Sequence, residues 1–141
     1  MKKIRHFLDI DKFSTDTIKK LLLASHKLKN EVFNNKSLLK KILVMVFEKP
    51  STRTRLSFEI GMKQLHGEVV ILDQNDTQLG RGESIKDTIR VISKYADIIM
   101  YRGSSEERLD EIVKVSEIPV INGLTDKSHP CQIMADIMTL E

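Results

Sequence analysis

The stretch ILVMVFEKPSTRTRLSFE, residues 42–59, joins an unbroken apolar run to a segment that is typical of a helix start. The run ILVMVF fits a β-strand that is buried on both faces. Pro50 then turns the chain away from the strand, and either Ser51 or Thr52 can cap the following helix. The stretch therefore predicts a strand–loop–helix unit, which is the repeating element of α/β folds.

Three further apolar runs predict the rest of the sheet: VVIL (69–72), DIIMY (97–101) and IPVI (118–121). Helical patterns alternate with them, and we expect helices over 15–33 and 53–66, and from Ser84, Ser104 and His129–Pro130 onward. This alternation predicts an α/β fold, with a layered sheet of about four parallel strands and helices on both faces. Its strand-to-helix loops gather at the carboxyl edge of the sheet, where ligands bind in such folds.

Composition excludes several classes of protein. The 141 residues fit one domain, with 23 Lys and Arg against 20 Asp and Glu, and few aromatic residues, so we expect no nucleic-acid partner. No apolar stretch reaches the length of a membrane span, and no secretory signal is present, so we expect a cytoplasmic protein without a membrane partner. The single cysteine, Cys131, excludes an internal disulfide and is expected to pack. No spacing of ligand residues indicates a metal site.

The loop EKPST at the end of the first strand has the chemistry of an anion site. Free N–H groups and the helix dipole favour an anion at a helix start. The hydroxyls of Ser51, Thr52 and Thr54 add hydrogen-bonding groups, and Arg53 adds a guanidinium whose fork suits phosphate. Two arginines oppose the dipole here. A bound phosphate accounts for Arg53, whereas Arg55 can instead brace the loop or a subunit contact.

The other carboxyl-edge loops carry weaker signals. Arg102 ends the third strand before Gly103, and it either forms a turn or points into the same pocket as Arg53. His129 and Gln132 lie three residues apart at a helix start, so both can face one cleft. The histidine can equally be a cap or a surface group.

Taken together, the motifs resemble those of the transcarbamylases, in particular the carbamoyl-phosphate domain of ornithine carbamoyltransferases. The matching segments are FEKPSTRTRLSFE (47–59), GRGESIKDT (80–88), MYRG (100–103) and PVINGLTDKSHPCQIMADIMT (119–139). They span nearly the whole chain in the order of the family. The resemblance implies transfer of carbamoyl from carbamoyl phosphate to L-ornithine, which gives L-citrulline and phosphate, without a cofactor or metal.

The resemblance also implies roles for individual residues. Ser51, Thr52, Arg53 and Thr54 match the phosphate cradle, and Arg102 matches the arginine that bridges phosphate and carbamoyl oxygen. The catalytic group is then Arg102, His129 and Thr54, which donate to the carbonyl oxygen.

Two further residues complete the implied site. Gln132 matches the residue that holds the carbamoyl nitrogen. Gln78, in a polar loop (73–83) that by itself suggests a surface loop or a lid, matches a residue that reaches the phosphate site of the adjacent subunit in a homotrimer.

The resemblance covers only the carbamoyl-phosphate domain, residues 1–141. The helical pattern CQIMADIMTLE continues to the last residue, and we expect the ornithine-binding domain to be missing and the isolated chain to be inactive alone. Two alternatives stay open: an aspartate or other transcarbamylase domain, and a non-catalytic phosphate-binding or assembly module. Arg81 stands where the aspartate branch carries a lysine, which favours the ornithine branch.

Overall fold

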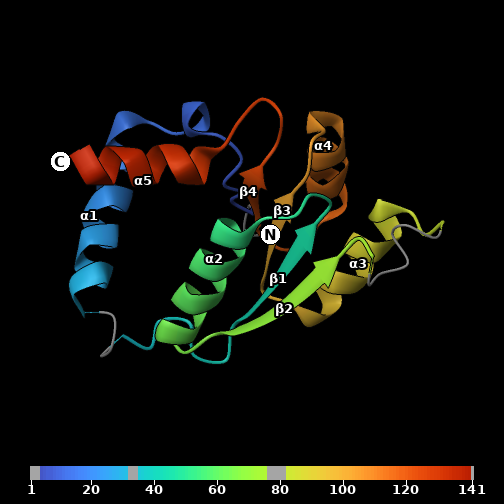
Figure 1. Ribbon diagram of the computed structural model, residues 1–141, viewed down its shortest axis with the longest axis horizontal. Helices are drawn as coiled ribbons and strands as arrows, with labels where there is room; N and C mark the ends of the chain where they lie inside the picture. Colours follow the sequence, from blue (N-terminus) through green and yellow to red (C-terminus); the bar gives the residue numbers. More distant parts are fainter. Residues whose placement is uncertain (1–3, 32–34, 76–81, 141) are drawn as a thin grey trace.

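The computed structural model describes residues 4–31, 35–75 and 82–140. Its sheet has four parallel strands, β1 (Ile42–Phe47), β2 (Glu68–Asp73), β3 (Ile98–Arg102) and β4 (Val120–Leu124), in the order β2-β1-β3-β4. The predicted parallel α/β sheet is confirmed (Figure 1).

Helices cover both faces of this sheet, as predicted. A short 3₁₀ helix, η1, comes first, and the α-helices are α1 (Thr15–Glu31), α2 (Thr52–Gln64), α3 (Ile85–Tyr95), α4 (Glu106–Val115) and α5 (Pro130–Leu140). Alternate side chains of β1 point to opposite faces. Val44 and Val46 join a core cluster with α3 and α4, whereas Leu43 and Met45 join a second cluster with α2. In Figure 1, α5 crosses α1, and the two helices are in contact.

The helix starts follow their capping residues. Ser51, and not Thr52, caps α2, because its hydroxyl accepts from the Thr54 N–H at 3.2 Å. Ser84 caps α3 and also donates to Asp87, as its spacing predicts. Helix α4 begins near Ser104, as predicted, but Ser104 is not its cap. The Ser104 carbonyl accepts from the Asp126 N–H instead, and the next residue, Ser105, caps α4.

The helix ends agree with the prediction to within a few residues. Helix α1 is observed to Glu31, and the last two positions of its predicted range, 32–33, lie outside the described residues. Helix α2 stops at Gln64, two residues before the predicted end.

The prediction that all four strands are buried on both faces is wrong for β2. Strand β1 is almost fully buried. None of the residues of β2 is buried, and the side chain of Val70 is 46% exposed. Strand β2 is exposed because it is an edge strand of the sheet and pairs with β1 alone. Its continuous apolar run therefore resembles a central strand without being one.

The other edge of the sheet is closed by the N-terminal segment. Phe7 forms a parallel bridge with Ile121 of β4, through hydrogen bonds of 2.8 Å to Val120 and from Asn122. The Asn122 side chain donates to the Leu8 carbonyl at 3.0 Å. Strand β4 begins two residues after the start of the predicted range, 118–121, and ends three residues beyond it, at Leu124, which pairs with Arg102 of β3.

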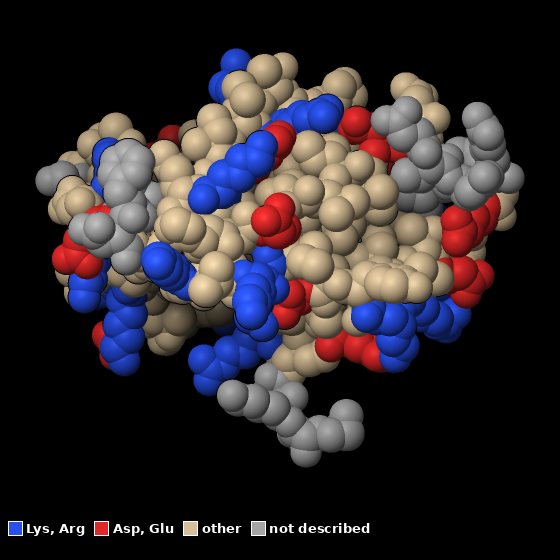
Figure 2. Space-filling model, turned by 90° about the horizontal axis from the view of Figure 1, so that it is seen from below, with Lys and Arg blue, Asp and Glu red and all other residues tan. Residues whose placement is uncertain are grey.

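Charges of both signs are interspersed over the face seen in Figure 2. Within residues 4–31, 35–75 and 82–140, no helix has both the length and the apolar character that crossing a membrane requires.

Candidate functional site at the carboxyl edge

Three strand ends meet at the carboxyl edge of the sheet. In the register, Phe47 of β1 pairs with Arg102 of β3, and Arg102 pairs with Leu124 of β4. Two backbone hydrogen bonds extend this alignment into the loops, from Glu48 N–H to the Arg102 carbonyl at 2.8 Å and from Gly103 N–H to the Leu124 carbonyl at 2.9 Å. The three predicted loops are therefore fixed next to one another.

Arg102 and Thr54 form the centre of this edge. The Arg102 Nη1 donates to Thr54 Oγ1 at 2.9 Å, and Thr54 is almost fully buried. Burial lowers the pKa of Arg102, and repulsion from the Arg53 guanidinium lowers it further. The prediction that Arg102 and Arg53 share one pocket fits this proximity. Two like charges held together favour an anion between them.

Two buried nitrogen atoms at this edge have no hydrogen-bond partner among the described residues: Arg102 Nε and His129 Nδ1. Unsatisfied buried polar atoms are rare in folded proteins and are costly, because each has lost its water without a replacement. Both belong to residues that the sequence selects as site residues. The unused hydrogen-bonding capacity of these two nitrogens fits a polar ligand at this edge of the sheet.

His129 lies close enough to Arg102 to be repelled by its charge. Burial lowers the pKa of His129, Arg102 lowers it further, and Asp136 opposes the change. The imidazole is therefore neutral at pH 7 and can donate one hydrogen bond without adding a full charge.

This lowered pKa predicts a pH dependence of stability. The folded state binds the His129 proton more weakly than the unfolded chain, so stability is complete above pH 6.5 and falls as the pH drops below this value. His6, whose pKa burial also lowers, contributes in the same direction. We expect urea unfolding between pH 5 and 7 to show this loss, and His129→Gln to reduce it. An unchanged pH profile in His129→Gln would contradict the assignment.

The other predicted residues lie around this centre. Ser51 is half-buried in the cap of α2, and Thr52 and Arg53 are exposed in the first turn. Gln132 is exposed on α5, one turn after His129, where its Nε2 donates to Asp136 Oδ1 at 2.8 Å. Gln78 lies outside the described residues.

Arg55, whose role the sequence left open, has a carboxylate partner of its own. Its Nη1 lies 3.4 Å from Asp73 Oδ2, at the end of β2. The two side chains border a polar cleft of about 540 Å³ between the 48–52 loop and residues 73–75. This ion pair ties the first turn of α2 to the end of β2, and the role of Arg55 as a brace of the loop stays a prediction.

A half-buried acid, Glu48, was missed by the sequence reasoning and links the loops at this edge. Glu48 accepts from the Tyr101 hydroxyl at 2.8 Å and from Arg108 Nε at 2.9 Å. The Glu48 carboxylate and burial raise the pKa of Tyr101 above its ordinary value, so the phenol stays protonated as a donor. The sequence did offer one signal for a role of Glu48, since it is an acid within an otherwise basic loop. This contact ties Tyr101, the residue before Arg102, to the 48–52 loop.

The loop that carries His129 is held in the same way. Lys49, in the 48–52 loop, forms a 2.9 Å ion pair with Asp126. The Thr125 hydroxyl donates to Glu106 at the start of α4. Cys131 packs under the loop, with its thiol 3.6 Å from the Asn122 carbonyl, and burial raises its pKa to about 11. The thiol is therefore protonated at neutral pH, which fits the expected packing role.

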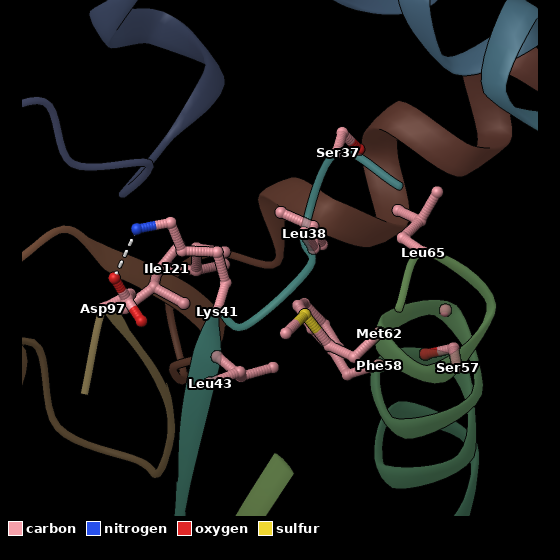
Figure 3. A pocket seen from close by; sticks show the side chains of 12 residues that line it. Ser37, Leu38, Lys41, Leu43, Ser57, Phe58, Met62, Leu65, Asp97 and Ile121 are labelled. Carbon is pink, nitrogen blue, oxygen red and sulfur yellow. Dashed lines mark hydrogen bonds and ion pairs between the residues drawn. The ribbon is translucent and has the colours of Figure 1, made fainter. Parts of the chain in front are cut away.

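An apolar groove lies elsewhere in the molecule. It has a volume of about 570 Å³ and is lined by Leu43, Phe58, Met62 and Leu65, with the Lys41–Asp97 ion pair at one side (Figure 3). Lys41 and Asp97 precede β1 and β3, so this groove opens at the amino edge of the sheet. The charged site at the carboxyl edge is separate from it.

An open parallel α/β sheet that brings two arginines, Arg53 and Arg102, together at its carboxyl edge is typical of proteins that bind a small anionic ligand. The family model for the aspartate/ornithine carbamoyltransferase carbamoyl-P binding domain matches residues 5–141, and the chain belongs to this family. Within the described residues, no group of three or more His, Cys, Asp or Glu side chains could hold a metal ion.

Individual relatives agree with the family assignment. The chain is 50% identical to the ornithine carbamoyltransferase of Nitrobacter winogradskyi over 141 residues, which cover 97% of this chain and 46% of that protein. The anabolic ornithine carbamoyltransferase of Campylobacter jejuni superposes with a TM-score of 0.91 at 42% identity, over 97% of this chain and 45% of that one. The catalytic subunit of M. jannaschii aspartate transcarbamoylase superposes with a TM-score of 0.88 at 39% identity, over 97% of this chain and 46% of that one. The chain spans about half the length of these proteins.

Proposed function

We propose that these 141 residues form the carbamoyl-phosphate half of an ornithine carbamoyltransferase. The proposed reaction joins carbamoyl phosphate and L-ornithine to give L-citrulline and phosphate. The observation that carries the proposal is the pair of buried, unpartnered nitrogens, Arg102 Nε and His129 Nδ1, beside the Arg102–Thr54 hydrogen bond. Ornithine binding is assigned to a second domain outside these residues.

Each end of the ligand has suitable partners in this proposal. The phosphate lies at the start of α2, where free N–H groups, the hydroxyls of Ser51 and Thr52 and the Arg53 guanidinium neutralise it. Arg102 lies between the phosphate and the carbamoyl oxygen. Gln132 holds the carbamoyl nitrogen.

The proposed chemistry needs positioned donors and no covalent intermediate. The uncharged amine of ornithine attacks the carbamoyl carbon, a C–N bond forms, and negative charge grows on the carbonyl oxygen. Arg102, His129 and Thr54 donate to that oxygen, and each such donor typically lowers the barrier by ~3 kcal/mol. The C–O bond to phosphate then breaks, and the departing phosphate can take the proton that the amine releases. His129 acts as a neutral donor and not as a nucleophile.

The assembly and setting of the whole protein are part of the same proposal. Gln78 of one subunit reaches the phosphate site of its neighbour in a homotrimer, in the cytoplasm, and the enzyme serves arginine metabolism. The polar cleft beside Ser51 and Thr52 supports this arrangement, because it leaves the phosphate loop accessible from the side of residues 73–75.

Calorimetry with carbamoyl phosphate and with inorganic phosphate tests the binding proposal. We expect the unmodified chain to bind both and to prefer carbamoyl phosphate. Gln132→Ala is expected to remove most of that preference and to leave phosphate binding in place. Equal affinity for the two ligands in the unmodified chain would favour the second candidate, a non-catalytic phosphate-binding module.

An assay for citrulline tests the assignment of ornithine to a second domain. The 141-residue chain, supplied with carbamoyl phosphate and L-ornithine, is expected to form no citrulline. Appreciable turnover would contradict that assignment. The similarity to the M. jannaschii aspartate transcarbamoylase makes L-aspartate the necessary second acceptor for assays of any longer form.

A further inference from the structure

The side-chain amide of Gln132 is held in one orientation. Its Nε2 donates to Asp136 Oδ1 at 2.8 Å, and the two residues lie four apart on α5, so they share one face of the helix. Within residues 4–31, 35–75 and 82–140, the Asp136 carboxylate has no other hydrogen-bond or ion-pair partner. Gln132 is therefore its one hydrogen-bond partner among these residues.

The chemistry of this pair fixes which end of the amide is free. A glutamine amide has a donor end and an acceptor end of nearly the same shape, and either can face a ligand. An ionised carboxylate only accepts hydrogen bonds, so it selects the NH₂ end of Gln132. The oxygen, Oε1, is then left without a partner and is available as an acceptor.

The arginines of the site supply hydrogen-bond donors but no acceptor. Arg102 can only donate, and the Thr54 hydroxyl already accepts from it. A carbamoyl group presents both an oxygen, which needs donors, and an NH₂ group, which needs acceptors. Asp136 also lies near enough to His129 to act on its charge, so its carboxylate is close to the site.

We propose that Asp136 is a positioning residue that makes the site selective for carbamoyl phosphate by turning the Gln132 oxygen toward the carbamoyl NH₂ group. This inference rests on the proposed function and adds the residue that sets its selectivity. A group that cannot donate, such as the methyl group of acetyl phosphate, gains nothing from that oxygen. The alternative is a surface pair that only supports helix α5.

Calorimetry with carbamoyl phosphate, acetyl phosphate and inorganic phosphate distinguishes the two. We expect Asp136→Ala to weaken carbamoyl phosphate binding about fivefold, the typical effect of one lost hydrogen bond. Phosphate and acetyl phosphate are expected to bind equally well or slightly better, because a negative charge has been removed. Asp136→Glu keeps an acceptor at this position and is expected to restore part of the preference.

A double-mutant cycle tests whether Asp136 acts through Gln132. If it does, Asp136→Ala has no further effect on carbamoyl phosphate affinity in a chain that already carries Gln132→Ala. Circular dichroism confirms that each variant is folded before its affinity is compared. A helix-supporting role predicts the same change for all three ligands.

The outcomes separate this inference from the proposed function. A preference for carbamoyl phosphate that survives Asp136→Ala overturns the inference and leaves the proposed function standing. Full additivity of the two substitutions also overturns it. An unmodified chain that does not bind carbamoyl phosphate overturns the proposed function, and the inference with it.

Discussion

Replacing Arg102 with alanine is expected to weaken carbamoyl phosphate binding about 100-fold. Hydrogen bonds to charged groups contribute ~1.5–3 kcal/mol each, and a guanidinium can form two of them with one anion. Arg102 is the residue whose buried Nε lacks a partner while its Nη1 donates to Thr54. Isothermal titration calorimetry at fixed ionic strength measures the loss.

A second arginine provides the matched control. Arg55 lies in the same loop–helix unit and carries the same charge, but it pairs with Asp73 at the far side of the loop. Arg55→Ala is expected to change affinity much less than Arg102→Ala. Equal losses in the two variants would mean that general positive charge, and not the position of Arg102, binds the ligand.

Removing the charge of Arg102 also carries an expectation for stability. In the free chain, Arg102 is repelled by Arg53 and is partly deprived of water. Arg102→Met keeps most of the apolar stem and removes the charge, so the free energy of unfolding is expected to stay the same or to rise. A binding residue that costs stability is common in functional sites. Urea unfolding of the ligand-free chain checks this point.

Gly103→Ala is expected to destabilise the chain by about 2–3 kcal/mol, the range of an overpacked core. A Cβ at this position would lie 2.5 Å from Tyr101 Cζ, closer still to the Tyr101 hydroxyl, and 3.1 Å from Glu48 Oε2. The tyrosine cannot move away easily, because its side chain is fully buried and its hydroxyl is bonded to Glu48. Glycine therefore stands here to let the ring approach the backbone.

Another glycine in the chain serves as the control. Gly61 lies within helix α2, and a Cβ there would meet nothing within 4 Å. Gly61→Ala is expected to stabilise the chain by about 0.5–1 kcal/mol, because alanine favours a helix interior. Urea midpoints of both variants test the pair. An unchanged midpoint for Gly103→Ala would show that the tyrosine ring can move out of the way.

Much of the fold could be predicted because its signals are local. Apolar runs located the four strands, and Ser84 and Pro130 marked helix starts at the residues where they occur. The errors came from non-local contacts. The exposure of β2 depends on its place at the edge, and the end of β4 at Leu124 depends on pairing with Arg102 of β3.

The candidate site divides in the same way. Motif positions identified Arg53, Thr54, Arg102 and His129, because functional loops follow strand ends in this topology. The supporting acid, Glu48, was missed because its partners, Tyr101 and Arg108, are 53 and 60 residues away in the chain. Asp136 was missed although its spacing of four from Gln132 is visible in the sequence, since nothing in that spacing says which end of the amide is free.

The bridge between Phe7 and Ile121 has a consequence for the order of folding. Residues of the N-terminal segment and of β4 that hydrogen-bond to each other are separated by 114 positions. A ribosome makes the N-terminal segment first, and this segment has no strand to pair with until nearly the whole of the described chain has been synthesised. Closing so large a loop is slow compared with forming a helix. The sheet is therefore completed by two segments that are synthesised far apart in time, and a chain halted before residue 120 would keep the open edge of β3 available for pairing with other molecules.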